Sequence, residues 1–71
     1  MSRTLAEIIQ GNWPQLAGYA RIAWDELTLD ELIRTKGDAQ QLIDLVQRRY
    51  EMPREDAQKQ VMSFFERHRT A

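Results

Sequence analysis

Residues 28–41 read TLDELIRTKGDAQQ, and this stretch contains the starts of two helices and the end of one. Thr28 and Glu31 have the three-residue spacing of a capping box, in which each side chain binds the other residue's backbone N–H. Gly37 can adopt the left-handed conformation that ends many helices, and Asp38 is a second capping residue directly after it. The stretch therefore predicts a short helix after Thr28, a stop at Gly37 and a longer helix after Asp38.

Apolar residues on both sides of this stretch recur at three- and four-residue spacing, which is typical of helices with one buried face. On the N-terminal side, Asn12 and Pro14 indicate a helix start, and the apolar face of that helix is predicted to run to Leu27. On the C-terminal side, Met52-Pro53 indicates a joint before a fourth helix, because the residue before Pro is disfavoured in helical conformation. The residues predicted to share the apolar faces are Trp13, Leu16, Ala17, Ala20, Ala23, Trp24, Leu27, Ala39, Leu42, Ile43, Val46, Tyr50, Ala57, Val61, Phe64, Phe65 and His68.

These signals predict an all-α protein, a small bundle of four helices arranged as two packed helical hairpins, because the joints are too short for a long crossover. We expect one helical domain over residues 11–71, preceded by an N-terminal arm or short helix over residues 1–10. Only three Gly and two Pro occur in 71 residues, which leaves few reversals for a β-sandwich. Gly18 lies inside a predicted helix, and we interpret it as a position where another helix approaches closely.

Composition and charge exclude several functions. The formal net charge of -1 gives no bulk attraction to nucleic acid or to an anionic membrane. The chain has no Cys, which excludes disulfides and thiolate metal sites. Uninterrupted apolar runs fall far short of the roughly 20 residues of a membrane helix, and Glu7 interrupts the segment where a signal peptide is apolar. We expect a soluble cytoplasmic protein that has no cofactor and no membrane contact.

The ionisable residues predict no catalytic site. His68 is the single histidine and stands between Arg67 and Arg69, which favours helix-end capping or solvent exposure over ligand binding. The four carboxylates within residues 25–31 have simpler roles as caps or solvated charges, because acid–base catalysis needs burial to shift a pKa. No glycine-rich phosphate loop is present. An enzyme is therefore the weakest functional hypothesis.

Three apolar residues lie beyond the single stripe that each helix needs for its core. They are Tyr19, Ile22 and Leu45. Surplus apolar side chains indicate a surface that contacts another protein or a second copy of the same chain.

A basic face is the alternative interaction surface, formed by Arg48, Arg49, Arg54 and Lys59. Residues 34–71 carry eight Lys and Arg against six Asp and Glu, a local balance of +2 that could serve phosphate contacts. Basic side chains also favour helix C-termini and i,i+4 pairs, and no aromatic residues interleave with them for base stacking. Nucleic acid is therefore the less favoured partner.

A larger pattern extends over about residues 11–65. It consists of Gly11-Asn12-Trp13, Gln15, Gly18, Trp24, Leu27-Thr28, Asp30-Glu31-Leu32, Gly37, Gln41-Leu42, Gln47, Arg49-Tyr50, Ala57 and Val61. This pattern resembles the CsbD-like family of small bacterial proteins. The resemblance implies a bundle of two packed helical hairpins in the cytoplasm, associated with the general stress response, and it carries over no catalytic residue.

The chain departs from that family in two places. Members of the family are usually very hydrophilic, with Lys and Gly around the first helix, whereas residues 16–24 are here much more apolar. The Tyr-Gly that usually ends the third helix is here Tyr50-Glu51. The added apolar surface favours self-association or a protein partner over a purely solvating role. We therefore expect a non-enzymatic, stress-associated interaction protein, with weak nucleic-acid binding as the alternative.

Overall fold

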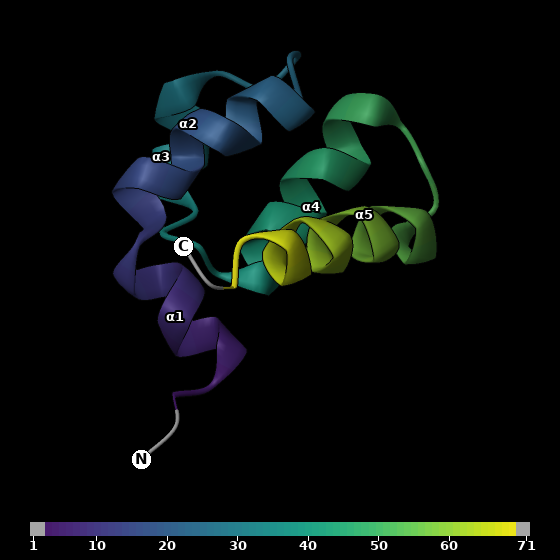
Figure 1. Cartoon of the computed structure of the whole chain (residues 1–71). Coiled ribbons are helices and arrows are strands. Elements are labelled where there is room, and N and C mark those ends of the chain that lie inside the picture. Colours follow the sequence, from purple (N-terminus) through teal and green to yellow (C-terminus); the bar gives the residue numbers. More distant parts are fainter. Residues whose placement is uncertain (1–2, 70–71) are drawn as a thin grey trace.

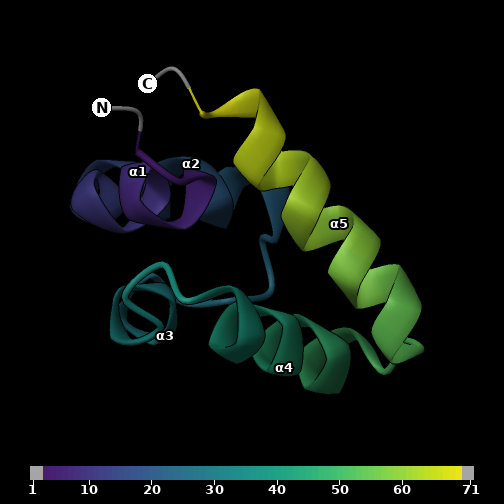
Figure 2. The same cartoon turned by 90° about the horizontal axis from the view of Figure 1, so that it is seen from below.

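The computed structural model describes residues 3–69, which form five helices and no strand (Figure 1). The helices are α1 (Leu5–Gly11), α2 (Trp13–Ala23), α3 (Leu29–Arg34), α4 (Ala39–Tyr50) and α5 (Arg54–Arg67). Helices α2 and α3 pack against each other, as do α4 and α5, and α1 contacts both α2 and α5. Figure 2 shows α4 and α5 diverging from the turn that joins them, with α1, α2 and α3 beside them.

The all-α prediction is confirmed for the described residues; α2 to α5 are four helices within residues 11–71, and α1 lies mostly in residues 1–10, where an arm or a short helix was predicted. The arrangement as two packed hairpins stays a prediction. Residues 1–2 and 70–71, which belong to the predicted arm and to the predicted domain, lie outside the described residues.

Helix α1 begins at a capping box that the sequence prediction missed. The hydroxyl oxygen of Thr4 accepts a hydrogen bond from the backbone N–H of Glu7 at 3.1 Å, and the carboxylate of Glu7 accepts one from the backbone N–H of Thr4 at 3.0 Å. Ile9 of this helix is fully buried. The cap and the burial of Ile9 together make this short segment helical and join it to the core.

Helix α2 begins after Asn12, as predicted, but ends at Ala23 rather than extending to Leu27. Trp24 has a φ of -127° and a ψ of 82°, values outside the helical region, and a turn follows it. Trp24 and Leu27 are buried because the turn directs them into the core, whereas Ala23 is exposed and is not the core residue we predicted. The three- and four-residue spacing of apolar residues therefore extends beyond the end of α2 to Trp24 and Leu27, which is why the helix was predicted too long.

The caps predicted around α3 and α4 are confirmed. The hydroxyl oxygen of Thr28 accepts from the backbone N–H of Glu31 at 3.1 Å, and the carboxylate of Asp38 accepts from that of Gln41 at 3.0 Å. Gly37 has a φ of +77°, the left-handed conformation predicted for it. These local signals separate α3 from α4.

Helix α4 ends at Tyr50, and Glu51 follows it with a left-handed φ of +51° at the position where the CsbD-like pattern usually has Gly. The backbone N–H of Met52 donates to the carbonyl of Gln47 at 3.2 Å, which completes a Schellman-type helix end. Pro53 then precedes α5. The helix end therefore keeps the geometry that Gly provides even though a side chain is present.

The core contains apolar side chains from all five helices and from the turn after α2. The buried hydrophobic residues are Ile9, Trp13, Leu16, Ala17, Ala20, Trp24, Leu27, Leu32, Leu42, Ile43, Val46, Ala57, Val61, Phe64 and Phe65. The predicted burial of both Trp side chains is confirmed. Ala39 and Tyr50 are only partly buried against this cluster, and His68 is half-buried at the end of α5.

Two glycines have opposite surroundings. Gly18 is exposed, and no atom lies within 4 Å of the position where its Cβ would stand, so the predicted close approach of another helix is wrong. At Gly37, a Cβ would lie 3.3 Å from the ring of Trp13 and 3.3 Å from the Cα of Gln10. Only the second glycine is required by the fold.

We predict that Gly18→Ala raises the free energy of unfolding by about 0.5–1 kcal/mol, because Ala restricts the unfolded chain and fits the helix. Gly37→Ala is expected to lower it by about 1–2 kcal/mol or more, because a side chain is strained at positive φ and would press on Trp13. Urea denaturation of both variants measures the two effects. A loss of stability in Gly18→Ala would contradict the exposed position of that residue.

Candidate functional site

Arg49 of α4 binds the segment that leads into α3. One terminal nitrogen of its guanidinium donates to the backbone carbonyl of Glu26 at 2.6 Å, and the other forms an ion pair with the carboxylate of Glu31. That carboxylate also accepts from the backbone N–H of Thr28 at 3.0 Å. The hydrogen bond from Thr28 and the positive charge of Arg49 hold the pKa of Glu31 below its ordinary value. Glu31 therefore caps α3 and connects it to α4.

Tyr50, the next residue of α4, binds the same segment. Its phenolic oxygen accepts a hydrogen bond from the backbone N–H of Glu26 at 3.1 Å and lies 3.5 Å from a carboxylate oxygen of Asp25. The CsbD-like pattern included Arg49-Tyr50, but local spacing gave no sign that both side chains bind the turn after α2. Their role in the structure is to hold that turn against α4.

The four residues of the predicted basic face do not form one continuous surface, because their side chains have different partners and Lys59 lies on another helix. Arg54 pairs with Asp44 at 2.5 Å and donates to the side-chain oxygen of Gln40 at 2.6 Å. Arg48 donates through Nε to the backbone carbonyl of Asp44 at 3.3 Å. Lys59 lies on α5, beside Trp24 and away from these contacts.

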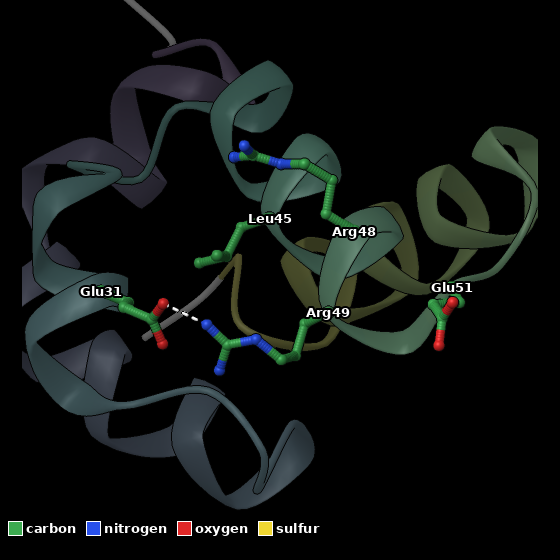
Figure 3. A pocket seen from close by; sticks show the side chains of 5 residues that line it. All are labelled: Glu31, Leu45, Arg48, Arg49 and Glu51. Atoms are coloured by element: carbon green, nitrogen blue, oxygen red, sulfur yellow. Dashed lines mark hydrogen bonds and ion pairs between the residues drawn. The ribbon is translucent and has the colours of Figure 1, made fainter.

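Leu45, Arg48 and Arg49 line one shallow hollow of about 370 Å³, together with Glu31 and Glu51. Figure 3 shows the side chains of Glu31 and Arg49 pointing toward each other, with the guanidinium of Arg48 directed away from this pair. Two carboxylates therefore accompany the two guanidinium groups. This charge balance does not favour a bound phosphate.

Tyr19 and Ile22 lie together at another place, between the C-terminal half of α2 and the end of α5. They line a second hollow, and we call its lining the α2–α5 patch: Tyr19, Ile22, Ala23, Phe64, Arg67 and His68. Ile22 is 80% exposed and Tyr19 is 55% exposed. Leu45, the third residue of the predicted apolar surface, is half-buried in the first hollow and does not belong to this patch.

Aromatic contacts hold the α2–α5 patch in place. The ring centroids of Tyr19 and His68 are 5.3 Å apart, and those of Phe64 and His68 are 4.4 Å apart. Phe64 is buried, so His68 lies on the edge of the core and supports the exposed ring of Tyr19. The sequence placed His68 on the apolar face of its helix, but its contact with Tyr19 depends on how α2 and α5 pack.

The described residues contain no group of three or more His, Asp or Glu side chains that could hold a metal ion. None of the helices in residues 3–69 is long and apolar enough to cross a membrane. The geometry thus defines a class: a small all-helical protein in which polar side chains hold the helix connections and exposed apolar side chains gather between α2 and α5.

Comparison with known proteins identifies the family within that class. The sequence is 50% identical over 62 residues to a UPF0337 protein of Bordetella pertussis, and the match covers 87% of this chain and 94% of that protein. It is 36% identical over 62 residues to a UPF0337 protein of Pseudomonas aeruginosa, with 87% and 95% covered. It is also 36% identical over 58 residues to the UPF0337 protein YjbJ of Escherichia coli, with 82% and 84% covered.

The chain belongs to the UPF0337 family, which is the CsbD-like family that the sequence pattern indicated. No family model and no solved structure matches the sequence. The names of the relatives state a family and no activity.

The depressed pKa of Glu31 predicts a pH dependence of stability. Because this carboxylate binds protons less readily in the folded chain, its contribution is present above the unfolded pKa of about 4.3 and is lost as the pH falls through the lower folded pKa. We predict that Glu31→Gln reduces the loss of unfolding free energy between about pH 5 and pH 3, measured by urea denaturation. Gln can still cap Thr28, so the variant isolates the charge.

Glu55→Gln is the matched control, because Glu55 is exposed on α5 and forms no ion pair with another described residue. Its pH dependence is expected to follow that of the wild type more closely. An identical pH dependence in Glu31→Gln and the wild type would contradict the pairing of Glu31 with Thr28 and Arg49.

Proposed function

We propose that the protein is a non-enzymatic, stress-associated protein of the bacterial cytoplasm that acts by binding another protein chain through the α2–α5 patch. The exposure of Ile22 is the observation that carries this proposal, because an 80% exposed Ile stands beside the half-exposed ring of Tyr19. Covering apolar surface contributes about 25 cal/mol per Å². Exposed apolar residues that gather in one patch mark a site of interaction.

The patch is also suited to binding because its parts are already fixed. Tyr19 lies against His68, and His68 lies against the buried ring of Phe64. A partner that covers a preformed surface loses less conformational entropy than one that must order it. The contacts of Tyr19 with His68, and of His68 with Phe64, distinguish Tyr19 from an exposed apolar side chain without such packing.

The absence of enzymatic activity is part of the proposal and rests on how the ionisable groups are used. Glu31 caps α3 and pairs with Arg49, and Asp38 caps α4. His68 packs between aromatic rings. The association with stress and the cytoplasmic location rest on the CsbD-like resemblance.

Weak nucleic-acid binding is the alternative that the sequence left open, and the geometry favours it less. Arg49 and Arg54 are paired with carboxylates, and Lys59 lies apart from Arg48. A phosphate would therefore have to displace existing ion pairs to reach two of the four basic residues.

Site-specific photocrosslinking tests the proposed function. We predict that a photoreactive phenylalanine analogue at position 22 forms an adduct with a protein chain in cells, because a partner covers the α2–α5 patch. Position 62 is the control, since Met62 is 39% exposed on α5 and does not line that patch. Gel analysis and mass spectrometry measure the yield and identify the adduct. We expect a several-fold higher yield at position 22, in growing or in starved cells.

Equal yields at the two positions, or no adduct at position 22 under either condition, would contradict the proposal. A nucleic-acid adduct at position 22 would contradict it as well. Circular dichroism of each purified variant shows whether the helical fold is retained.

A further inference from the structure

A third hollow, of about 440 Å³, lies where the end of α2 meets α5, and we call it the α5 hollow. Its lining differs in chemistry from that of the hollow beside Arg49, where two carboxylates accompany two guanidinium groups. Among the described residues that line the α5 hollow, two are cations and none carries a carboxylate. The lining residues are Ala23, Trp24, Lys59, Gln60, Ser63 and Arg67.

Three polar side chains of this hollow lie on one side of α5. Lys59, Ser63 and Arg67 follow one another at four-residue spacing, and residues four apart are neighbours on a helix surface. At a rise of about 1.5 Å per residue, Ser63 lies about 6 Å along the helix axis from each cation. The long side chains of Lys59 and Arg67 can therefore both reach a group that is bound beside the hydroxyl of Ser63.

Trp24 fixes the direction of the amide group of Gln60. The indole N–H donates to the side-chain oxygen of Gln60 at 3.0 Å, and an indole has no acceptor that could bind the amide nitrogen instead. Because Trp24 is buried, the amide oxygen faces the core and the amide NH2 group is left as a donor at the surface. Ammonium, guanidinium, amide and hydroxyl groups thus supply hydrogen-bond donors to one hollow.

The two cations of the α5 hollow are not neutralised by contacts within the described chain. Lys59 and Arg67 form no ion pair with a described residue. Glu66, next to Arg67 in the sequence, pairs with Arg69 at 3.1 Å. Glu55 precedes Lys59 by about one helical turn but does not line the hollow.

Two further carboxylates stand in the turn after α2. A carboxylate oxygen of Asp25 lies 3.5 Å from the hydroxyl oxygen of Tyr50, and neither Asp25 nor Glu26 lines the α5 hollow. These charges lower the positive potential around the hollow, but they leave its donors open to a bound anion.

We propose that the α5 hollow binds the phosphate group of a small phosphate monoester. Such a group carries a charge of about -1.5 to -2 at neutral pH and has three acceptor oxygens, which match two cations together with the hydroxyl and amide donors. The volume of the hollow leaves room for part of the molecule that carries the phosphate. Nucleic acid is a poorer match, because its phosphodiesters carry one charge each and need a row of cations. Arg48 lies on α4 and Arg54 is paired with Asp44, so neither extends such a row from the hollow.

This inference goes beyond the proposed function and does not depend on it, because phosphate binding requires no protein partner. The α5 hollow and the α2–α5 patch are neighbours, since Ala23 and Arg67 line both.

Titration of the isotope-labelled protein with methyl phosphate, followed by nuclear magnetic resonance, tests the inference. At about pH 7, where a monoester carries nearly two charges, we expect saturable shifts of the indole N–H signal of Trp24 and the amide signals of Gln60. The dissociation constant is expected at about 1–10 mM, because an open hollow leaves the anion partly solvated. Dimethyl phosphate is the control ligand at the same ionic strength. It should bind about fivefold more weakly or less, because it carries one charge.

Gln60→Glu gives the sharpest comparison. A carboxylate oxygen at position 60 can still accept from the indole N–H of Trp24, but the amide donors are replaced by a negative charge. The variant should weaken binding of methyl phosphate about tenfold or more. Gln58→Glu is the matched control, since Gln58 is exposed on α5 and does not line the hollow. It adds the same charge and should change the affinity by less than about threefold.

Removal of positive charge gives a second comparison. Lys59→Gln and Arg67→Gln should each weaken binding about fivefold or more, because each removes a charged donor from the hollow. Arg48→Gln removes the same charge from α4 and should leave the dissociation constant within about twofold. Equal weakening in all three variants would show non-specific attraction of the anion and overturn the inference.

Three other results would also overturn the inference. The first is a set of shifts that rise linearly with methyl phosphate up to about 100 mM, without saturation. The second is equal affinity for methyl phosphate and dimethyl phosphate. The third is saturable binding of a single-stranded oligonucleotide or of anionic vesicles without binding of methyl phosphate, which would assign the cations to a macromolecular surface. The spectra of each variant show whether it retains the fold.

Discussion

The structure depends on the buried side chain of Trp13. Its indole N–H donates to the backbone carbonyl of Leu32 at 2.7 Å, and its ring stands edge-on to Phe65 with centroids 6.5 Å apart. The ring also closes over Gly37, where a Cβ would lie only 3.3 Å away. One side chain of α2 therefore contacts α3, the turn before α4, and α5. A buried indole is tolerated because its polar group is paired, and the pairing fixes where α3 ends.

Polar contacts hold the other end of α2. Arg49 and Tyr50 of α4 bind the backbone of Glu26, and the indole N–H of Trp24 donates to the side-chain oxygen of Gln60 at 3.0 Å. These contacts join segments that are 23 to 36 residues apart in the chain. The turn after α2 is fixed in this way, and Tyr19 and Ile22 remain at the surface. The exposed apolar side chains of the α2–α5 patch therefore take no part in the core or in these polar contacts. The proposed protein-binding function rests on this exposed apolar surface.

The local parts of the fold could be predicted from the sequence, and the long-range parts could not. The caps at Thr28 and Asp38 and the left-handed conformation of Gly37 were predicted, because each depends on residues within one helical turn, but α3 ends at Arg34, three residues before Gly37. The same pattern at Thr4 and Glu7 was missed, although its spacing is identical. The end of α2 was predicted too late in the chain, because Trp24 and Leu27 continue the apolar spacing although they lie in the turn after the helix.

In the candidate site, Tyr19 and Ile22 share one surface but Leu45 does not. Arg49 belonged to the basic face of the less favoured alternative, and its charge is used within the fold in the ion pair with Glu31, which only the packing of α4 beside α3 shows.

The indole of Trp13 is enclosed by α3, Gly37 and α5, and nuclear magnetic resonance tests this enclosure most directly. We predict a nuclear Overhauser effect between the ring protons of Trp13 and the α protons of Gly37. We also predict that the indole N–H of Trp13 exchanges with solvent only through opening of the whole core. Rapid exchange of that proton, with no Overhauser effect to Gly37, would show that the ring is not buried against this turn and would contradict the account.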